Sequence, residues 1–235
     1  PIRGKIEMPE NIMDVVLLKS DGIPTYHFAH AVDDHFMRTN LVIRGDEWLA
    51  SYPLHKQLFD LCGFALPKYA HIAPIMKLEV TVDEAGGHQR KRKDPEAAVG
   101  FYAEQGFPSV SVLEYLMTIA NSNYEEWHAA HGDKTIDDFT LSLKKMPVSG
   151  ALFDMVKLND VSKEMISKLT AEECYNLIME WAKEHDENIY TFGTQDKDGF
   201  MKTINLWKMS GKKVRKDVGK WSDLRAMFGY LYTPE

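Results

Sequence analysis

Leu41-Val42-Ile43-Arg44-Gly45-Asp46-Glu47 decides the fold, because an apolar β-type run passes directly into the start of a helix. A short apolar run closed by glycine predicts a buried strand. Asp46 is a suitable N-cap and Glu47 a suitable first-turn acid, and Gly63 is a natural stop for the helix that follows. Pro53 lies inside that helix and is predicted to divide it into two pieces.

The same alternation extends on both sides of this stretch. Asp14 to Lys19 predicts a buried strand that ends in a turn at Ser20-Asp21-Gly22. Tyr26 to Met37 predicts a helix, and its apolar stripe consists of Phe28, Val32 and Phe36. A third apolar segment, Tyr69 to Met76, follows Pro67. Strands that alternate with helices favour parallel crossover units, and therefore part of a doubly wound α/β domain.

The second half of the chain is predicted to be mainly helical. One amphipathic helix begins near Ser109 or Ser111, either of which could cap it. Its apolar positions are Val112, Leu113, Leu116, Met117 and Ala120. A second helix runs to His185 from Thr170, which has the capping-box spacing with Glu173. Its buried side is predicted to consist of Tyr175, Leu177, Ile178 and Trp181.

The composition is that of an acidic, folded chain. Its 235 residues carry 28 Lys and Arg against 35 Asp and Glu, a formal charge of −7, and 44% of them are hydrophobic. Intrinsic disorder is therefore a poor interpretation, and the length fits one large domain or two small ones. The sequence has neither a membrane-spanning apolar run nor a secretory signal, so we expect a cytoplasmic protein. Cys62 and Cys174 make neither a disulfide framework nor a zinc site.

Arg44 is a charged residue at the carboxyl end of an apolar strand, the edge where open parallel sheets bind ligands. Its guanidinium could hold a carboxylate in a bidentate fork, or it could form a structural ion pair with Asp46 or Glu47. The residues alone favour neither interpretation. Tyr26 and Trp48 could wall a small-molecule pocket, although an aromatic residue on an amphipathic helix usually belongs to the core.

Histidines gather in the first predicted helix. His27, His30 and Asp34 fall roughly on one helical face, so a metal site is conceivable there. A packed helix that needs no metal is the favoured interpretation, because an apolar stripe runs through the same segment. His71, in the third apolar segment, is likewise predicted to be a hydrogen-bonded core residue.

Two basic clusters could neutralise phosphates. The first is Arg90-Lys91-Arg92-Lys93, and the second lies between Trp207 and Trp221. The second cluster contains Lys208, Lys212, Lys213, Arg215, Lys216 and Lys220. Cations stabilise the charge that develops in phosphoryl transfer, and cations mixed with aromatic residues suit an RNA backbone. On charge alone, a solvated turn and a solvated surface over two core tryptophans are favoured over these functions.

Several stretches, in matching order and spacing, resemble the bacterial glutamyl-tRNA synthetases, which are class I enzymes. The earlier stretches are Ser20 to Ala29, Val32 to His35 and Val42 to Leu49. The later ones are Arg92 to Glu96, Ile119 to Trp127, Val148 to Asp154 and Lys220 to Asp223. The resemblance covers nearly the whole chain. Glutaminyl-tRNA synthetases share the Pro-Thr-Tyr turn but are not similar through Val42 to Trp48, so the glutamyl family is the more specific match.

The resemblance implies a fold in two parts. Residues 1–94 would be the second half of the catalytic domain, the C-terminal half of a Rossmann-type doubly wound parallel sheet. Residues 95–235 would be the mainly helical stem-contact region and the start of the following helical domain. The family's first signature, of the His-x-Gly-His type, has no counterpart before Asp14. We therefore expect a piece of a longer synthetase that is inactive by itself.

The activity that the resemblance implies is ATP-dependent activation of glutamate to glutamyl-adenylate, followed by transfer to the 3′ end of tRNA(Glu). Tyr26 and Arg44 match positions that hold the amino acid, and His30 stands where many members carry asparagine. The residues that match the ATP site are Glu47, Trp48, Ile75, Met76 and Lys91. ATP with Mg²⁺ is implied as substrate, and neither a bound metal nor a prosthetic group is expected.

The basic loop of residues 90–93 falls where the family has its second signature, usually Lys-Leu-Ser-Lys-Arg. Lys91 and Arg92 take the places of its Lys-Arg pair, and as catalytic residues they would stabilise the triphosphate. The loop contains no serine and is short, so either it is a true deletion or residues are missing from the sequence.

The second basic cluster is predicted to contact tRNA through Lys212, Lys213, Arg215, Lys216 and Lys220. We expect a monomer. The alternative is a non-catalytic tRNA-binding module derived from a synthetase, and the reading frame upstream of Pro1 would distinguish the two.

Overall fold

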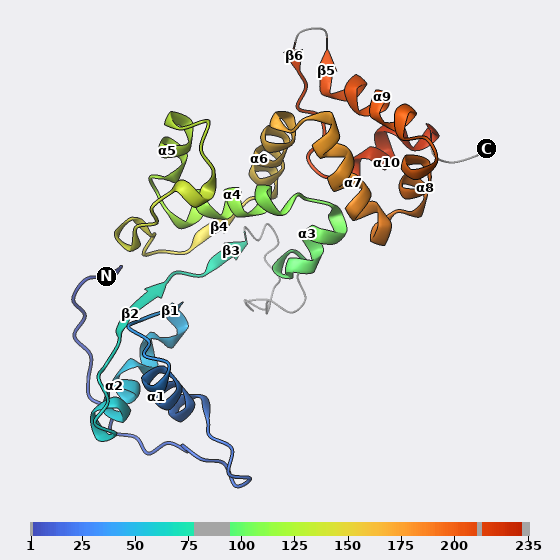
Figure 1. Ribbon diagram of the computed structural model, residues 1–235. Coiled ribbons are helices and arrows are strands. Elements are labelled where there is room, and N and C mark those ends of the chain that lie inside the picture. Colours follow the sequence, from blue (N-terminus) through green and yellow to red (C-terminus); the bar gives the residue numbers. More distant parts are fainter. Residues whose placement is uncertain (1, 78–94, 211–212, 232–235) are drawn as a thin grey trace, which may run out of the picture. The chain divides into compact units, whose positions relative to one another are not determined.

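The structure is a computed structural model that describes residues 2–77, 95–210 and 213–231 (Figure 1). The chain divides into two compact units. The first unit comprises Pro1–Met76 with Ile119–Leu152, and the second comprises Lys77–Thr118 with Phe153–Glu235. The functional division after residue 94, which the sequence suggests, stays a prediction.

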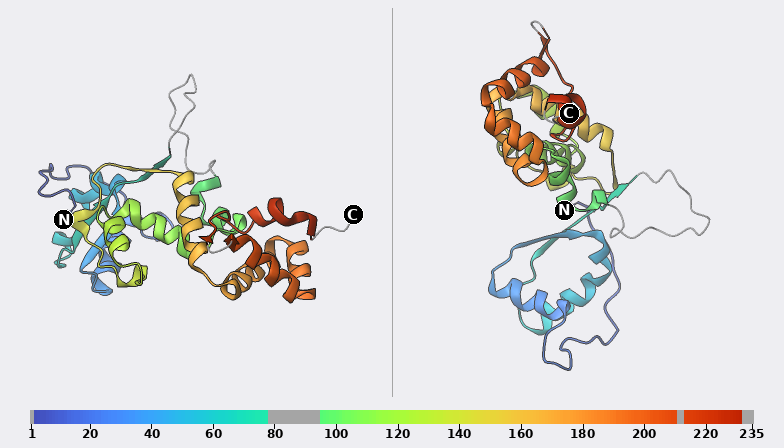
Figure 2. Two further views of the ribbon diagram at one scale, coloured as in Figure 1. Left: turned by 90° about the horizontal axis from the view of Figure 1, so that it is seen from above. Right: turned by 90° about the vertical axis from the view of Figure 1, so that its right-hand side faces the viewer.

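The first unit contains a parallel crossover. Its elements are α1 (Tyr26–Phe36), β1 (Leu41–Gly45), the 3₁₀ helix η1 (Asp46–Ser51), α2 (Tyr52–Leu61) and β2 (Lys68–Ile72). β1 and β2 pair in parallel, with Leu41 opposite Lys68 and Gly45 opposite Ile72. α1 and α2 lie side by side in Figures 1 and 2. The predicted strand at residues 41–45 and its parallel crossover are therefore confirmed.

Local residue chemistry sets the boundaries of the helix after β1. Pro53 lies in the first turn of α2, so the helix is divided into η1 and α2 as predicted. Gly45, not Asp46, occupies the N-cap position, and Asp46 is the first residue of η1. Gly63 ends the segment with a φ of 68°, a left-handed conformation that glycine adopts without strain.

α1 and α2 bury a small hydrophobic core between them. Its buried residues are Ala31, Leu54, Leu58 and Phe59, with Leu17 and Phe64 packed against them. The predicted stripe of α1 is wrong at its end, because Phe36 is 74% exposed. The buried residues of α1 are instead His30 and Ala31. Polar groups therefore share the buried face of this helix.

The predicted strand at residues 14–19 does not form. Val16 is 65% and Leu18 56% exposed, and Leu18 makes only an isolated bridge to Pro24. The backbone N–H of Thr25 donates to the carbonyl of Leu17 at 2.8 Å, so the segment folds back on the chain before α1. A strand needs a neighbouring strand for its ladder, and no such neighbour lies in the described residues. The turn that follows does form, with a φ of 81° at Gly22.

The third apolar segment forms two strands. β2 ends at Ile72 and β3 (Ile75–Lys77) begins after Pro74, which lacks the N–H that a continuous ladder requires. β3 pairs with β4 (Ala151–Phe153). The remaining elements of the first unit are α5 (Tyr124–Ala130), η4 (Ile136–Asp138) and η5 (Leu143–Lys145). Within the described residues the sheets are two-stranded, so the fold is mixed α/β with one small parallel sheet and many helices.

The second unit is mainly helical, as predicted. Its elements include η3 (Pro95–Ala97), α3 (Val99–Gln105), α6 (Met155–Lys168), α7 (Ala171–His185), α8 (Glu187–Gln195), α9 (Lys197–Lys208), β5 (Met209–Ser210), β6 (Lys213–Val214), α10 (Asp223–Phe228) and η6 (Gly229–Leu231). α7, α8 and α9, orange in Figure 2, pack against one another. Their core includes Ile178, Ile189, Phe200, Trp207 and Trp221.

Capping determines where α7 begins. The side chains of Thr170 and Glu173 form the predicted capping box, with the Thr170 backbone N–H donating to Glu173 Oε2 at 2.7 Å. Of the predicted buried residues, Ile178 is fully buried, whereas Tyr175, Leu177 and Trp181 are partly buried and pack on the core. The predicted helix and its start are therefore confirmed.

The helix predicted near residue 109 also forms, but its buried face differs from the prediction. α4 (Ser109–Ala120) begins at the earlier of the two predicted caps. It buries Ser111, Glu114 and Tyr115, whereas Leu113 is 51% exposed. The Tyr115 hydroxyl accepts a hydrogen bond from the backbone N–H of Asp154 at 2.6 Å, so this buried tyrosine has a polar partner.

Across the described residues, the longest apolar helical stretches are too short or too polar to cross a lipid bilayer.

Candidate functional site

Arg44 is the second-last residue of β1 and is paired in register with His71 on β2. Only 9% of Arg44 is exposed. A buried guanidinium is costly unless its charge and its N–H groups are satisfied. We therefore take Arg44 and the groups that contact it as the candidate site.

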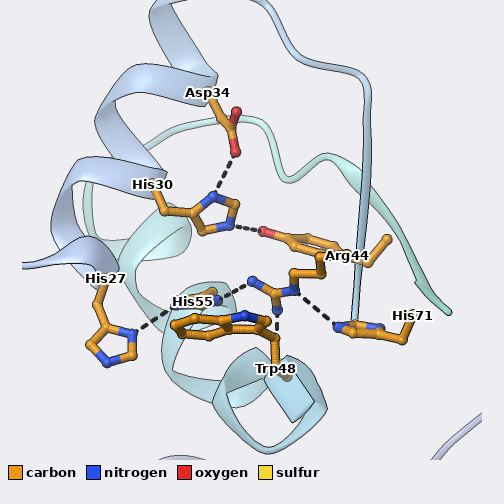
Figure 3. Close-up of polar contacts among 8 residues, drawn as sticks. His27, His30, Asp34, Arg44, Trp48, His55 and His71 are labelled. Atoms are coloured by element: carbon orange, nitrogen blue, oxygen red, sulfur yellow. Dashed lines mark hydrogen bonds and ion pairs between the residues drawn. The ribbon is translucent and has the colours of Figure 1, made fainter. Parts of the chain in front are cut away.

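Three acceptors surround the guanidinium (Figure 3). Nε donates to His71 Nε2 at 3.1 Å, Nη1 to His55 Nδ1 at 3.0 Å, and Nη2 to the Trp48 carbonyl oxygen at 3.3 Å. Because a guanidinium has five N–H groups and only donates, both imidazole nitrogens must accept. Five donors less three contacts leave two N–H groups, one on each terminal nitrogen.

The bond from Arg44 fixes the tautomer of His55. Since Nδ1 accepts, the ring carries its hydrogen on Nε2, which donates to His27 Nδ1 at 2.9 Å. His55 is fully buried, and burial together with the nearby charge of Arg44 lowers the pKa of His55 to about 3. Burial also lowers the pKa of His71. Both rings facing the guanidinium are therefore neutral at physiological pH.

A second chain of contacts supports the tyrosine next to Arg44. His30 Nδ1 lies 2.6 Å from Asp34 Oδ2, and His30 Nε2 lies 2.8 Å from the Tyr69 hydroxyl. Burial lowers the pKa of His30 and raises the pKa of Tyr69, so a neutral His30 accepts from the Tyr69 hydroxyl. The Tyr69 ring centroid lies 4.8 Å from Arg44 Cζ, which is cation–π range.

The charge of Arg44 has no carboxylate partner among the described residues. Asp46 pairs with Arg3, at 2.7 Å between Oδ2 and Nη2. Asp34 pairs with His30. Glu47 is exposed, and its carboxylate lies against Gly45. Neither Asp46 nor Glu47 forms the possible ion pair with Arg44, and among the described residues the groups that contact the buried cation are neutral.

Two aromatic side chains, Tyr26 and Trp48, pack on groups that contact this cation. Tyr26 begins α1 and is 47% exposed, and its ring stacks on that of His30 with centroids 5.7 Å apart. Trp48, from η1, packs on Tyr26 with ring centroids 4.4 Å apart. The Arg44 Cζ lies 6.0 Å from the Trp48 ring. The structure thus brings together the three residues predicted to hold an amino acid, together with Trp48.

Of the residues predicted to contact ATP, Glu47 and Trp48 lie in η1, directly after Arg44. The others lie further along the chain or outside the described residues. Ile75 and Met76 lie on β3 and are 50% and 43% exposed. The Met76 side chain lies against Gly150, where an added Cβ would come within 2.7 Å of Met76 Cε. Lys91 and Arg92 lie outside the described residues.

The second basic cluster is mostly engaged with partners. Arg215 pairs with Asp217 and Lys216 with Glu164, while Lys220 Nζ donates to Gln105 Oε1 at 2.6 Å. Lys212 and the side chain of Lys213 lie outside the described part.

The two tryptophans that flank this cluster are core residues. Trp207 is 3% and Trp221 2% exposed, so neither offers a ring face to an RNA base. Lys208 is also buried, and its Nζ donates to the Ile166 carbonyl at 2.8 Å near the end of α6. The interpretation of Trp207 and Trp221 as core residues is thus confirmed.

The sequence-based reasoning did not identify His55 as a site residue. Its neighbours Leu54, Leu58 and Phe59 are buried at helical spacing. A histidine among such residues is a signal of a buried polar contact, because a buried imidazole needs a partner. Among the described residues, no cluster of three or more His, Cys, Asp and Glu could hold a metal ion.

Comparison with known proteins places these residues in a family. Residues 1–160 match the family model described as tRNA synthetases class I (E and Q), catalytic domain. The glutamate–tRNA ligase of Clostridium perfringens (strain 13 / Type A) is 50% identical over 234 residues, which are 98% of this chain and 42% of that enzyme. The glutamate–tRNA ligase of Sorangium cellulosum (strain So ce56) is 45% identical over 98% of this chain and 42% of its own.

A solved structure shows the same fold. The crystal structure of glutamate–tRNA synthetase from Elizabethkingia anophelis aligns with a TM-score of 0.72 and 24% identity, covering 100% of this chain and 47% of that one. This chain thus spans about two fifths of the length of the curated relatives it matches. The match over residues 1–160 shows that the chain belongs to the class I tRNA synthetases of the glutamate and glutamine type.

Proposed function

We propose that the protein carries the glutamate-holding part of the active site of a glutamate–tRNA ligase. The complete reaction is the ATP-dependent activation of glutamate to glutamyl-adenylate, followed by transfer to the 3′ end of tRNA(Glu). One observation carries the proposal: Arg44 is buried, faces neutral groups and keeps one N–H group on each terminal nitrogen. One carboxylate can accept both of these N–H groups in a bidentate pair.

The surroundings of Arg44 favour an anion over a neutral ligand. The guanidinium has no protein carboxylate among the described residues, so a ligand carboxylate would be its first counter-ion. A hydrogen bond to a charged group contributes about 1.5–3 kcal/mol, roughly twice a neutral one. Glutamine carries an amide in place of the side-chain carboxylate, so it would leave the buried charge uncompensated where Arg44 binds the side chain of the amino acid. Tyr26 and Trp48 would line the ligand, and His30 would orient Tyr26 by stacking on it.

ATP would bind beside this site. We propose that Glu47, Trp48, Ile75 and Met76 contact the nucleoside and that Lys91 and Arg92 stabilise the triphosphate. The exposed apolar side chains of Ile75 and Met76 suit the face of an adenine ring. Mg²⁺ would enter with the ATP phosphates as part of the substrate.

The remaining parts of the active site would come from a larger protein. We propose that residues 1–94 complete a doubly wound catalytic domain and that residues 95–235 contact the tRNA stem. The chain alone is expected to be inactive. In the cell we expect a monomeric cytoplasmic enzyme.

tRNA contact is proposed for Lys212, Lys213, Arg215, Lys216 and Lys220. Arg215 and Lys216 are in exposed ion pairs, which contribute little to stability and can be exchanged for phosphate contacts at little cost.

An ATP–pyrophosphate exchange assay with glutamate and tRNA tests the proposal. The 235-residue chain alone should give no exchange. A complete synthetase that contains this chain should give exchange, and Arg44→Gln should abolish it. Exchange by the chain alone would contradict its predicted dependence on other parts. If Arg44→Gln does not change the exchange by the longer protein, the role assigned to Arg44 is contradicted.

A second candidate is a non-catalytic tRNA-binding module derived from a synthetase. The observation that favours it is the second basic cluster, in which Arg215 and Lys216 stand in exposed ion pairs. Two results together would favour this module over the ligase. tRNA binding would weaken steeply with salt, and cell extracts would contain no form of the chain that is longer than 235 residues.

A further inference from the structure

His55 and His71 meet the guanidinium of Arg44 from two different elements. His55 comes from α2 and His71 from β2, and each accepts one N–H through a ring nitrogen. Neither ring faces a ligand-sized opening by itself: His55 is fully buried and His71 is 7% exposed. Their contacts are therefore with the protein, and His55 lies against the rings of Tyr26 and His30 as well as the guanidinium. Any effect of the two imidazoles on a ligand is therefore indirect.

We propose that His55 and His71 are positioning residues for carboxylate recognition, which as neutral acceptors hold the guanidinium so that its two remaining N–H groups meet one carboxylate. The inference rests on the proposed function, since it specifies how Arg44 would bind glutamate. It assigns no contact between either imidazole and the substrate.

Two neutral imidazoles perform this task better than carboxylates would. A carboxylate in the place of either ring would neutralise Arg44 and compete with the ligand carboxylate. An apolar side chain would leave a buried N–H group without an acceptor, which is costly. A neutral imidazole supplies the acceptor and leaves the charge of Arg44 available.

The contacts around His55 keep it in the accepting form. The groups that act on it are Arg44 from β1, His71 from β2, and His27 and His30 from α1, and each of them disfavours a proton on the ring. The Nε2 hydrogen is engaged with His27 Nδ1 at 2.9 Å. Protonation of Nδ1 would place an N–H group against an N–H group of Arg44, so it would displace the guanidinium.

The first experiment measures the ring nitrogens directly in the 235-residue chain. Imidazole ¹⁵N shifts, recorded from pH 8 to pH 5, distinguish the two neutral tautomers and the protonated ring. We expect His55 to carry its hydrogen on Nε2 and His71 on Nδ1, with both rings neutral at pH 8 and His55 still neutral at pH 6. The opposite tautomer of either ring, or a protonated His55 in the folded chain at pH 6, would overturn the inference. The tautomers test whether the two rings accept from Arg44, and the binding measurements that follow distinguish a positioning role from a purely structural one.

The second experiment compares variants that keep or remove the accepting atom. Asparagine places its oxygen near the position of Nδ1 and glutamine near that of Nε2. His55→Asn and His71→Gln should therefore bind L-glutamate within about 3-fold of the unmodified chain, whereas His55→Leu and His71→Leu should bind about 10-fold to 100-fold more weakly, the loss expected for one hydrogen bond to a charged group. His35→Gln is the matched control, because His35 stacks on Phe64 and makes no contact with Arg44.

The outcomes separate this inference from the proposed function. If the leucine and amide variants bind L-glutamate equally well while Arg44→Gln does not bind it, the positioning role is overturned. The role of Arg44 in binding glutamate would then still hold. If the unmodified chain binds no glutamate, the proposed role of this chain fails, and the tautomers alone decide whether the two rings hold Arg44. If the leucine variants do not fold, as judged by circular dichroism, the amide variants and the tautomers decide.

Discussion

Arg44 donates a hydrogen bond of 3.0 Å to Nδ1 of His55, although both side chains are bases and both are buried. The contact is possible because only Arg44 carries the charge. It makes the buried guanidinium a cation that is surrounded by acceptors but lacks a counter-ion among the described residues.

Stability should fall in acid because of the buried histidines. Burial lowers the pKa of His30, His55 and His71 in the folded chain, whereas the unfolded chain binds protons at a histidine pKa of about 6.5. The unfolded state therefore binds more protons below that pH. The contribution of His55 is complete above pH 6.5 and decreases as the pH falls towards about 3, its folded pKa, by at most about 1.4 kcal/mol per pH unit.

Urea unfolding at pH 7.5 and pH 5.5, followed by the NMR signal of the buried Ala31, measures this effect. His55→Asn cannot titrate, so it should lose less stability between the two pH values than the unmodified chain. An equal loss in both proteins would show that His55 does not titrate as the structure requires.

The cap of α7 should be a measurable source of stability in the second unit. Thr170→Ala removes the side-chain oxygen that accepts from the Glu173 N–H at 3.2 Å, and it should cost about 1 kcal/mol. Thr191→Ala, an exposed position within α8, is the matched change and should be neutral or slightly stabilising. Equal urea midpoints for the two variants would argue against the capping box as a stabilising element.

Glu173, the acidic partner of Thr170 in the capping box, should titrate at unusually low pH. Hydrogen bonds from the Thr170 backbone and side chain lower the pKa of Glu173. This pKa, measured by carboxyl ¹³C shifts, should rise towards the ordinary glutamate value in Thr170→Ala.

tRNA affinity should depend on the second basic cluster. Replacing Lys212 and Lys213 by glutamine should weaken tRNA binding and reduce the slope of log K against log salt by about 1 for each phosphate contact that is lost. Lys56→Gln is a suitable control, since Lys56 is an exposed lysine of the first unit that pairs with Asp60. An unchanged salt slope in the double variant would place the tRNA contact elsewhere.

Local sequence signals predicted the elements that local interactions determine. Pro53 and Gly63 gave the division and end of the helix after β1, and Thr170 with Glu173 gave the start of α7, because each effect lies within one turn of backbone. The segment at residues 14–19 failed for the opposite reason. Its apolar residues are typical of a strand, but a strand is stable only beside a partner, which the sequence of one segment cannot supply.

The candidate site shows the same limit. The position of Arg44 at the end of an apolar strand left carboxylate binding and an ion pair open, and the resemblance to a family assigned Arg44, Tyr26 and His30 to amino-acid binding. His55 was not predicted, because its partners His27 and Arg44 lie 28 and 11 residues away and meet it only when α1, α2 and β1 pack together. The local sequence therefore indicated the charged residue, Arg44, but not His55, the neutral acceptor that contacts it.

Glutamate binding to the 235-residue chain, measured by calorimetry at pH 7.5, tests the central claim most directly. The chain should bind L-glutamate more tightly than L-glutamine. Arg44→Gln should abolish this binding, while Arg38→Gln, the same change at an exposed arginine after α1, should leave it unchanged. Equal binding of glutamate by the Arg44→Gln variant and the unmodified chain would contradict the account.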